Sequence, residues 1–106
     1  MITASKIRAL IHRIAEEFRP ERIILFGSHA GGRARADSDV DLLVVMPFRG
    51  KGARKSVEIL NRVEPDFPVD VIVRTPLQMQ QRLAASDYFL QDIVKRGKVL
   101  YEAAHP

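Results

Sequence analysis

The sequence contains no cysteine among its 106 residues, so it forms no disulfide and no thiolate metal site. Any bound metal must therefore have oxygen or imidazole ligands, which favours hard cations. Long apolar runs are also missing, because the longest uncharged one, Leu42 to Phe48, is far too short to cross a bilayer. The N-terminal residues lack the unbroken apolar core of a signal peptide. We therefore expect a cytoplasmic protein with no membrane-spanning segment.

The composition is that of a globular protein, with 46% hydrophobic and 28% charged residues. A chain of this length has room for one hydrophobic core, so we predict a single domain over residues 1–106. Lys and Arg number 17 against 13 Asp and Glu, which gives a net charge of +4. This balance suits an anionic partner such as a nucleotide, a nucleic acid or an acidic protein, but a solvated basic surface is also consistent with it.

Hydrophobic periodicity predicts helices alternating with strands, in the order αβ(α)βαβααβ. The strands are expected at residues 22–26, 40–46, 69–74 and, as an edge strand, 99–101. The helices are expected at residues 3–18, from the end of the basic loop Pro47–Lys55 to about Val63, after a Thr75 cap, and after a Ser86 cap. The bracketed element is one helical turn between the first two strands. The second helical stretch is indicated by Val57, Ile59, Leu60 and Val63, and the residues expected to face inward on the last one are Phe89, Leu90, Ile93 and Val94.

Two aspartates lie at the start of the second predicted strand, in the stretch DSDVDLLVV. Residues i and i+2 of a strand point to the same face, so Asp39 and Asp41 project together. Like charges this close repel, and aspartate is depleted in strands, so the pair destabilises the fold unless something positive compensates. Asp70 lies near the start of the next strand. If these two strands are neighbours, the three carboxylates converge.

Three converging carboxylates suit Mg²⁺, which prefers oxygen ligands in octahedral geometry. Two such ions about 3.5–4 Å apart can clamp the attacking and leaving oxygens of a phosphoryl or nucleotidyl transfer. The structural alternative is a polar turn in which Asp41 pairs with an arginine such as Arg33 or Arg35. The carboxylates alone leave both interpretations open.

The Gly27-Ser28 step at the end of the first strand favours the chemical interpretation. A glycine at this position lets a backbone approach a ligand closely, and Ser28 adds a hydroxyl and an N–H suited to phosphate. The motif is not a P-loop, because the Gly-Lys-Ser/Thr ending is absent, and a Gly-Ser pair alone is more often a simple turn. Together with the acids of the next strand, it provides an anion cradle beside a cation site.

These motifs resemble the signature of the minimal nucleotidyltransferases, relatives of the polymerase β palm. The matching residues are Gly27-Ser28, ten intervening residues, and then Asp39-Val40-Asp41-Leu42. The resemblance extends from the first helix, through Asp70 in VDVIV, to the closing RGKVLYE, and so covers nearly the whole chain. It implies an α+β domain with a mixed β-sheet flanked by helices. The short stand-alone form is similar to the antitoxin of HEPN–MNT toxin–antitoxin pairs, which transfers AMP from ATP to a tyrosine of its HEPN ribonuclease partner.

The resemblance also implies roles for individual residues. Gly27 and Ser28 would hold the β- and γ-phosphates of ATP, while the three acids would bind two Mg²⁺ ions and catalyse the transfer; these acids are Asp39, Asp41 and Asp70. Many relatives have Gly-Ser-Arg-Ala-Arg-Gly at the turn, whereas this sequence has Gly-Ser-His-Ala-Gly-Gly, with arginines displaced to positions 33 and 35. Arg33 is the expected substitute phosphate contact, unless the two arginines only neutralise nearby acids. His29 is either a phosphate or substrate contact or simply a surface residue.

Two functions are compatible with the resemblance. One is an Mg²⁺-dependent enzyme that transfers AMP to a HEPN-type toxin, and the other is a catalytically weak domain that acts as a stoichiometric binding antitoxin. The altered turn favours the second, but the presence of all three acids favours the first, since a pure binder has no chemical need of them. RNA binding by the basic loop is not favoured, because no aromatic residues are interleaved with the charges. The expected partners are a HEPN toxin and a nucleoside triphosphate, and self-association is left open.

Overall fold

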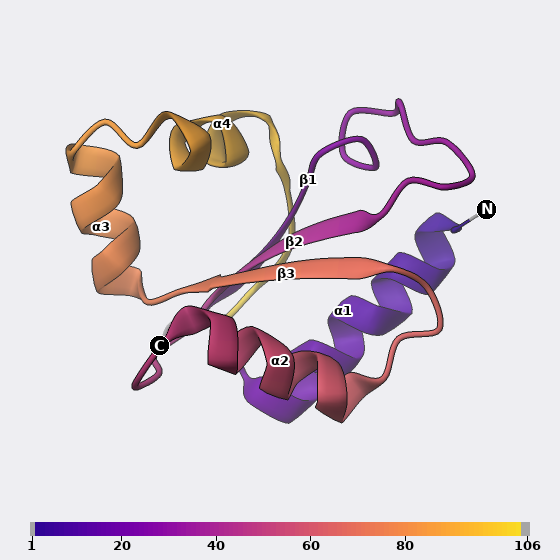
Figure 1. The fold of residues 1–106 in the computed structure, drawn as a ribbon, viewed down its shortest axis with the longest axis horizontal. Coiled ribbons are helices and arrows are strands. Elements are labelled where there is room, and N and C mark those ends of the chain that lie inside the picture. Colours follow the sequence, from indigo (N-terminus) through magenta and orange to yellow (C-terminus); the bar gives the residue numbers. More distant parts are fainter. Residues whose placement is uncertain (1, 105–106) are drawn as a thin grey trace.

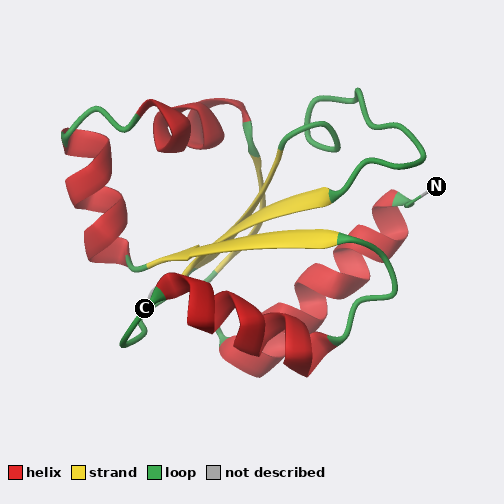
Figure 2. Ribbon diagram, in the orientation of Figure 1, coloured by secondary structure: helices red, strands yellow, loops and turns green. Residues whose placement is uncertain are grey.

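The computed structural model describes residues 2–104 and contains one four-stranded sheet with helices on both faces (Figure 1 and Figure 2). None of the helices within residues 2–104 has the length and apolar character needed to span a bilayer. Residues 27–38 between the first two strands form no regular helix, but the Gly31 N–H donates to the Gly27 carbonyl at 3.1 Å, so the single helical turn expected there is present as one hydrogen-bonded turn. The other expected elements are present, and they are α1 (Ala4–Phe18), β1 (Arg22–Phe26), β2 (Val40–Val45), α2 (Gly52–Val63), β3 (Val69–Arg74), α3 (Pro76–Ala84), α4 (Tyr88–Arg96) and β4 (Lys98–Glu102).

The strands are arranged in the order β3-β2-β1-β4, so β4 is an edge strand as expected. β1 runs antiparallel to both of its neighbours, whereas β2 and β3 are parallel and are joined through α2. The prediction of a mixed sheet is therefore confirmed. This topology places the end of β1, the start of β2 and the start of β3 together at one end of the sheet.

Successive side chains of β2 point into two hydrophobic clusters, one on each face of the sheet. On one face Val40, Leu42 and Val44 pack with the apolar stripes of α1 and α2. On the other, Leu43 and Val45 pack with buried residues of α3 and α4. The strand is thus buried on both sides, as is usual for an inner strand with a parallel neighbour. Because side chains alternate along the strand, Asp41 shares the α3–α4 face with Leu43 and Val45.

The helix starts follow local hydrogen-bonding signals. Thr3 accepts a hydrogen bond from the Lys6 N–H at the start of α1, and Thr75 forms the expected capping box with Gln78 at the start of α3. The predicted Ser86 cap of α4 is wrong. The residue that caps α4 is Asp87, whose carboxylate accepts a hydrogen bond from an N–H in the first turn of the helix. Aspartate and serine are about equally good caps, so the sequence alone does not distinguish neighbouring positions.

Two residues predicted to face inward, Phe89 and Val94, instead lie at the surface, and so does Val57 of the apolar pattern that predicted α2. Val57, Phe89 and Val94 have exposed fractions of 56%, 54% and 42%. The helices concerned are only 12 and 9 residues long, and each is covered along a narrow stripe. In α4 this stripe consists of Leu90 and Ile93, which are almost fully buried. A run of consecutive apolar residues on so short a helix must leave some of them exposed.

Gly97, between α4 and β4, is required by close packing. A Cβ at this position would overlap the Ile93 carbonyl oxygen and the Ile24 side chain. We expect Gly97→Ala to lower the free energy of unfolding by about 1–3 kcal/mol, the usual cost of overpacking a core. Thermal unfolding checks this, with Gly31→Ala as the control, because a Cβ at position 31 meets only ordinary contacts. An equal loss in both variants would exclude packing as the cause.

Candidate active site

Three aspartates lie at the end of the sheet where β1 stops and β2 and β3 begin. Asp39 and Asp41 flank the first residue of β2, and Asp70 is the second residue of β3. In the parallel register Asp41 is paired directly with Asp70, and neighbouring strands are separated by about 4.8 Å. The condition under which the three carboxylates converge, that β2 and β3 be neighbours, is therefore met. Asp41 is partly buried, whereas Asp39 and Asp70 are exposed.

The environment of Asp41 is electrostatically unfavourable for its charged form. Burial raises the pKa of the Asp41 carboxyl, and the charges of Asp70 and Asp39 raise it further. The nearby His29 acts in the opposite direction. Within residues 2–104, no ion pair joins Asp41 to an arginine, so the polar-turn alternative lacks its proposed partner. The structure thus places an incompletely compensated acid at the centre of the group.

Gly27 brings the phosphate-type turn directly against this acid. The preceding residue, Phe26, is paired with Asp41 across the β1–β2 ladder. Gly27 has a φ of +76°, and a Cβ there would overlap the Asp41 carboxylate. The Gly27 carbonyl accepts hydrogen bonds from the N–H groups of Ala30 and Gly31, both at 3.1 Å. Only glycine fits this combination of a left-handed backbone and close approach.

A cavity of about 350 Å³ opens beside the turn and faces α4. It lies within the range typical of small-molecule sites. The Arg33 side chain borders it, folded back to 3.5 Å from where a Cβ of Gly31 would lie. Phe26 and Phe89 form an edge-to-face pair in its wall, with ring centroids 5.9 Å apart. The complete lining is Phe26, Gly27, Ala30, Gly31, Arg33, Phe89, Asp92, Ile93, Arg96 and Gly97.

His29 occupies a position that the sequence did not indicate. Its Nε2 lies 3.2 Å from the carbonyl oxygen of Ser38, the residue before Asp39. The ring is partly buried, so His29 is not simply a surface residue. The sequence carries no signal for this contact, because its two partners are nine residues apart in an irregular loop.

The donor chemistry of the acids fits Mg²⁺, because carboxylate oxygens on adjacent strands are the ligands that this ion prefers. The acids are not drawn together into a preformed cage: within residues 2–104, no three His, Asp or Glu side chains are arranged closely enough to hold a metal ion. The raised pKa of Asp41 agrees with this, since carboxylates repel one another without a cation between them. The residues therefore fit a site that a cation would complete.

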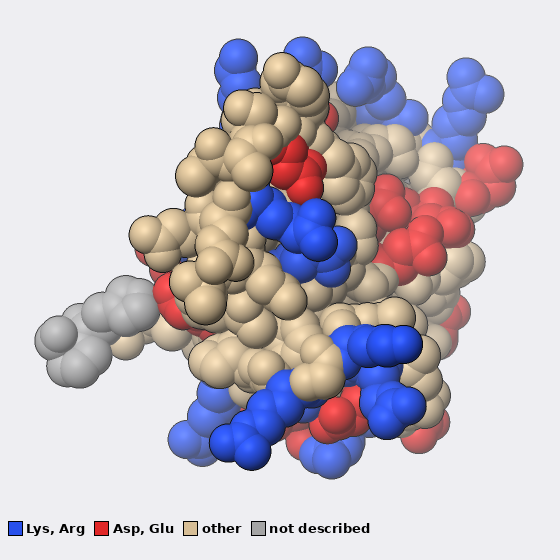
Figure 3. Space-filling model, turned by 60° about the vertical axis from the view of Figure 1, so that its left-hand side comes forward, with Lys and Arg blue, Asp and Glu red and all other residues tan. Residues whose placement is uncertain are grey.

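On the face shown in Figure 3, the positive charge does not form one continuous surface. Basic side chains stand along the upper edge, at the centre and along the lower edge, and acidic side chains lie between them and at the right. The basic loop is also shorter than predicted, because α2 begins at Gly52. Lys55, the last residue assigned to that loop, instead pairs with Glu58 at 3.2 Å and lies over the Phe18 ring. These contacts give no support to RNA binding by the loop.

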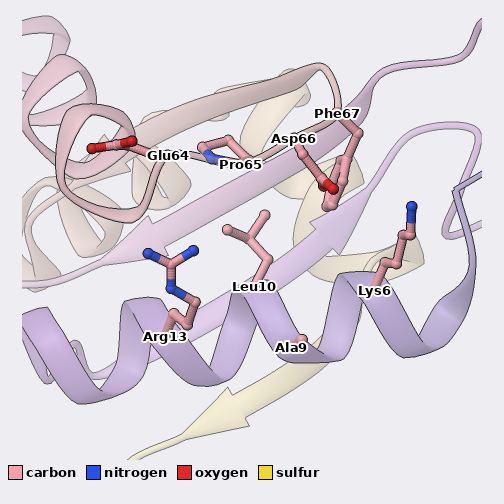
Figure 4. A pocket seen from close by; sticks show the side chains of 8 residues that line it. All are labelled: Lys6, Ala9, Leu10, Arg13, Glu64, Pro65, Asp66 and Phe67. Carbon is pink, nitrogen blue, oxygen red and sulfur yellow. The ribbon is translucent and has the colours of Figure 1, made fainter.

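A second cavity, of about 390 Å³, lies between α1 and the connection from α2 to β3 (Figure 4). Lys6 and Arg13 line one side of it, and Glu64 and Asp66 line the other. The apolar lining residue Leu10 belongs to the cluster on the α1–α2 face of the sheet. Because Asp41 lies on the opposite face, this cavity is separate from the acids and from the Gly-Ser turn.

Solved structures with a similar fold include nucleotidyltransferases and toxin–antitoxin complexes. A toxin–antitoxin complex with AMP-PNP is 22% identical, with a TM-score of 0.62 over 91% of this chain and 73% of that one. A candidate nucleotidyltransferase from Sulfolobus solfataricus is 21% identical, with a TM-score of 0.62 over 92% and 78%. The MntA–HepT toxin–antitoxin complex is 21% identical, with a TM-score of 0.56 over 91% and 70%. A comparison of the sequence with curated proteins found no significant match.

The family is shown by the sequence itself. Residues 7–100 match the nucleotidyltransferase domain family, and this range includes the Gly-Ser turn and all three acids. At such low identity the solved structures establish only the fold, which agrees with the expected α+β arrangement. The chain belongs to the nucleotidyltransferase domain family.

Proposed function

We propose that this protein transfers AMP from ATP to a hydroxyl, most simply that of a tyrosine, on a HEPN-type toxin, and that it thereby acts as the antitoxin. The observation that carries the proposal is the strand register that pairs Asp41 with Asp70. Asp39 lies two residues before Asp41, and the Asp41 carboxylate lies against Gly27. Family membership supports nucleotidyl transfer as the reaction type. The fold shared with the MntA–HepT complex supports a toxin as the partner.

In this reaction the acceptor oxygen bonds to the α-phosphorus of ATP while the bond between the α- and β-phosphates breaks. Pyrophosphate leaves, and Asp70 helps to remove the hydroxyl proton. Gly27 and Ser28 hold the outer phosphates at the end of β1, and Arg33 adds a positive charge at the edge of the cavity. Mg²⁺, held by the three aspartates when bound, supplies the positive charge that offsets the triphosphate.

A second candidate function is binding without catalysis. The observation that favours it is the altered turn, which has His29 and Gly31 where many relatives have arginine. In this case the domain would block a HEPN toxin by surface contact alone. Both candidates require the same partner, so the experiment must separate toxin neutralisation from covalent transfer.

The test is incubation of the protein with labelled ATP, Mg²⁺ and a HEPN toxin encoded beside its gene. We expect label to move to the toxin with the wild type and not with Asp39→Asn/Asp41→Asn, since removing metal ligands costs several kcal/mol of transition-state stabilisation. Toxin ribonuclease activity is measured in parallel. If both proteins neutralise the toxin equally and no label moves, the binding function replaces the enzymatic one.

A further inference from the structure

The loop between β1 and β2 contains two separate hydrogen-bonded turns, one at residues 27–33 and one at residues 35–38. In the second turn, the Arg35 N–H donates to the Ser38 hydroxyl at 2.8 Å, and the Ser38 N–H donates to the Arg35 carbonyl at 3.0 Å. The backbone hydrogen bonds within the loop stay inside one turn or the other. Among the hydrogen bonds of residues 2–104, the link between the two turns comes from a side chain.

The His29 side chain makes that connection. A carbonyl oxygen can only accept, so the His29 Nε2 carries a proton and donates to the Ser38 carbonyl at 3.2 Å. The ring also lines a cavity of about 250 Å³ together with Ile7 of α1 and Leu25 of β1. The imidazole thus lies beside α1 and β1, and its hydrogen bond to the second turn restrains it.

We propose that His29 is a positioning residue that ties the phosphate turn to the start of β2. It directly follows Ser28, and its hydrogen-bond partner Ser38 directly precedes Asp39. The bond therefore sets the direction in which the chain enters β2, and with it the position of the Asp39 carboxylate relative to Gly27-Ser28. This inference rests on the proposed function and adds to it a residue that holds Asp39 in position relative to the Gly27-Ser28 turn.

The test compares His29→Leu, which removes the donor, with His29→Gln, whose side-chain N–H₂ can still donate. His12→Leu is the control, because it removes an exposed imidazole on α1. For His29→Leu we expect kcat for AMP transfer to fall about 10- to 100-fold, the scale of an ångström-sized misplacement. The KM for ATP should change less than about threefold, since the bond orients an acid and does not hold the nucleotide. His29→Gln should recover most of kcat.

Limited trypsin digestion gives a second readout that does not depend on activity. The loop carries Arg33 and Arg35, and a released second turn should be cleaved about two- to tenfold faster in His29→Leu, the range expected for the loss of one hydrogen bond. The His29→Gln and His12→Leu proteins should be cleaved at the wild-type rate. If the wild type transfers no AMP but His29→Leu alone is cleaved faster, the proposed function fails, while the structural role of the His29–Ser38 hydrogen bond is supported. Equal cleavage of all proteins, or a rise in KM in place of the fall in kcat, would show that His29 does not position the start of β2.

Discussion

Replacing Asp41 by asparagine is expected to abolish nucleotidyl transfer and, at neutral pH, to raise the melting temperature of the protein. Transfer should fall about a thousandfold, because a metal ligand supplies several kcal/mol of transition-state stabilisation. Stability should rise because Asp41 is partly buried beside Asp39 and Asp70. Opposite changes in activity and stability are the signature of a residue retained for chemistry at the expense of the fold.

The direction of the stability change follows from the raised pKa of Asp41. Its folded-state value lies above the ordinary 3.8, so the folded protein binds the proton more tightly than the unfolded chain. Below the unfolded pKa both states are protonated and the acid costs nothing. As the pH rises through the folded pKa, the acid becomes charged and the wild type loses stability. The advantage of Asp41→Asn should therefore be greatest near neutral pH and vanish as the pH falls toward 3.8.

Thermal unfolding between pH 4 and 8 at low salt measures this difference. Since solvent screens a partly exposed acid, we expect a gain of only about 1–5 °C at pH 7. Asp37→Asn is the control, because Asp37 is an exposed acid in the loop before β2 and does not contribute to the raised pKa of Asp41. An Asp41→Asn protein that is less stable than the wild type at pH 7 would show that the carboxylate forms stabilising contacts instead.

The sequence was sufficient to single out the acids, because the periodicity of a strand is a local property. It predicts that Asp39 and Asp41 share a face without any knowledge of the sheet. The pairing of Asp41 with Asp70, in contrast, is not a local property of the sequence. It depends on which strands are neighbours and in which register, and both are decided by the burial of β2 on its two faces and by the path of α2. Sequence could state this convergence only as a condition.

Contacts made by the loop between β1 and β2 could not be predicted at all. The close approach of Gly27 to Asp41 depends on the β1–β2 register, and the bond from His29 to Ser38 depends on the path of an irregular loop. Neither has a repeating pattern in the sequence. The departure of this loop from the usual Gly-Ser-Arg-Ala-Arg-Gly was visible, but its physical meaning required the position of the His29 ring.

The second large effect is expected for Gly27→Ala, which should lose both stability and transfer activity. At a φ of +76°, alanine is strained by about 1–2 kcal/mol whatever surrounds it. Its methyl group would in addition overlap the Asp41 carboxylate. Either the turn or the acid must move, and a shift of about 1 Å at such a site can cost about 100-fold in rate. Thermal unfolding and the labelled transfer assay measure the two losses separately.

Gly32→Ala is the matched control, because Gly32 has a similar φ of +72° and no atom within 4 Å of an added Cβ. It should show the backbone strain alone and retain most of its activity. Combining Gly27→Ala with Asp41→Ala removes the overlapping carboxylate, so Gly27→Ala should cost less stability in the Asp41→Ala background than in the wild type, and the double variant should remain inactive. Such a positive coupling would show that the turn is held against the acid in solution. Additive losses, or an equal loss of stability in Gly32→Ala, would mean that backbone strain alone explains the glycine and that the turn does not press on Asp41.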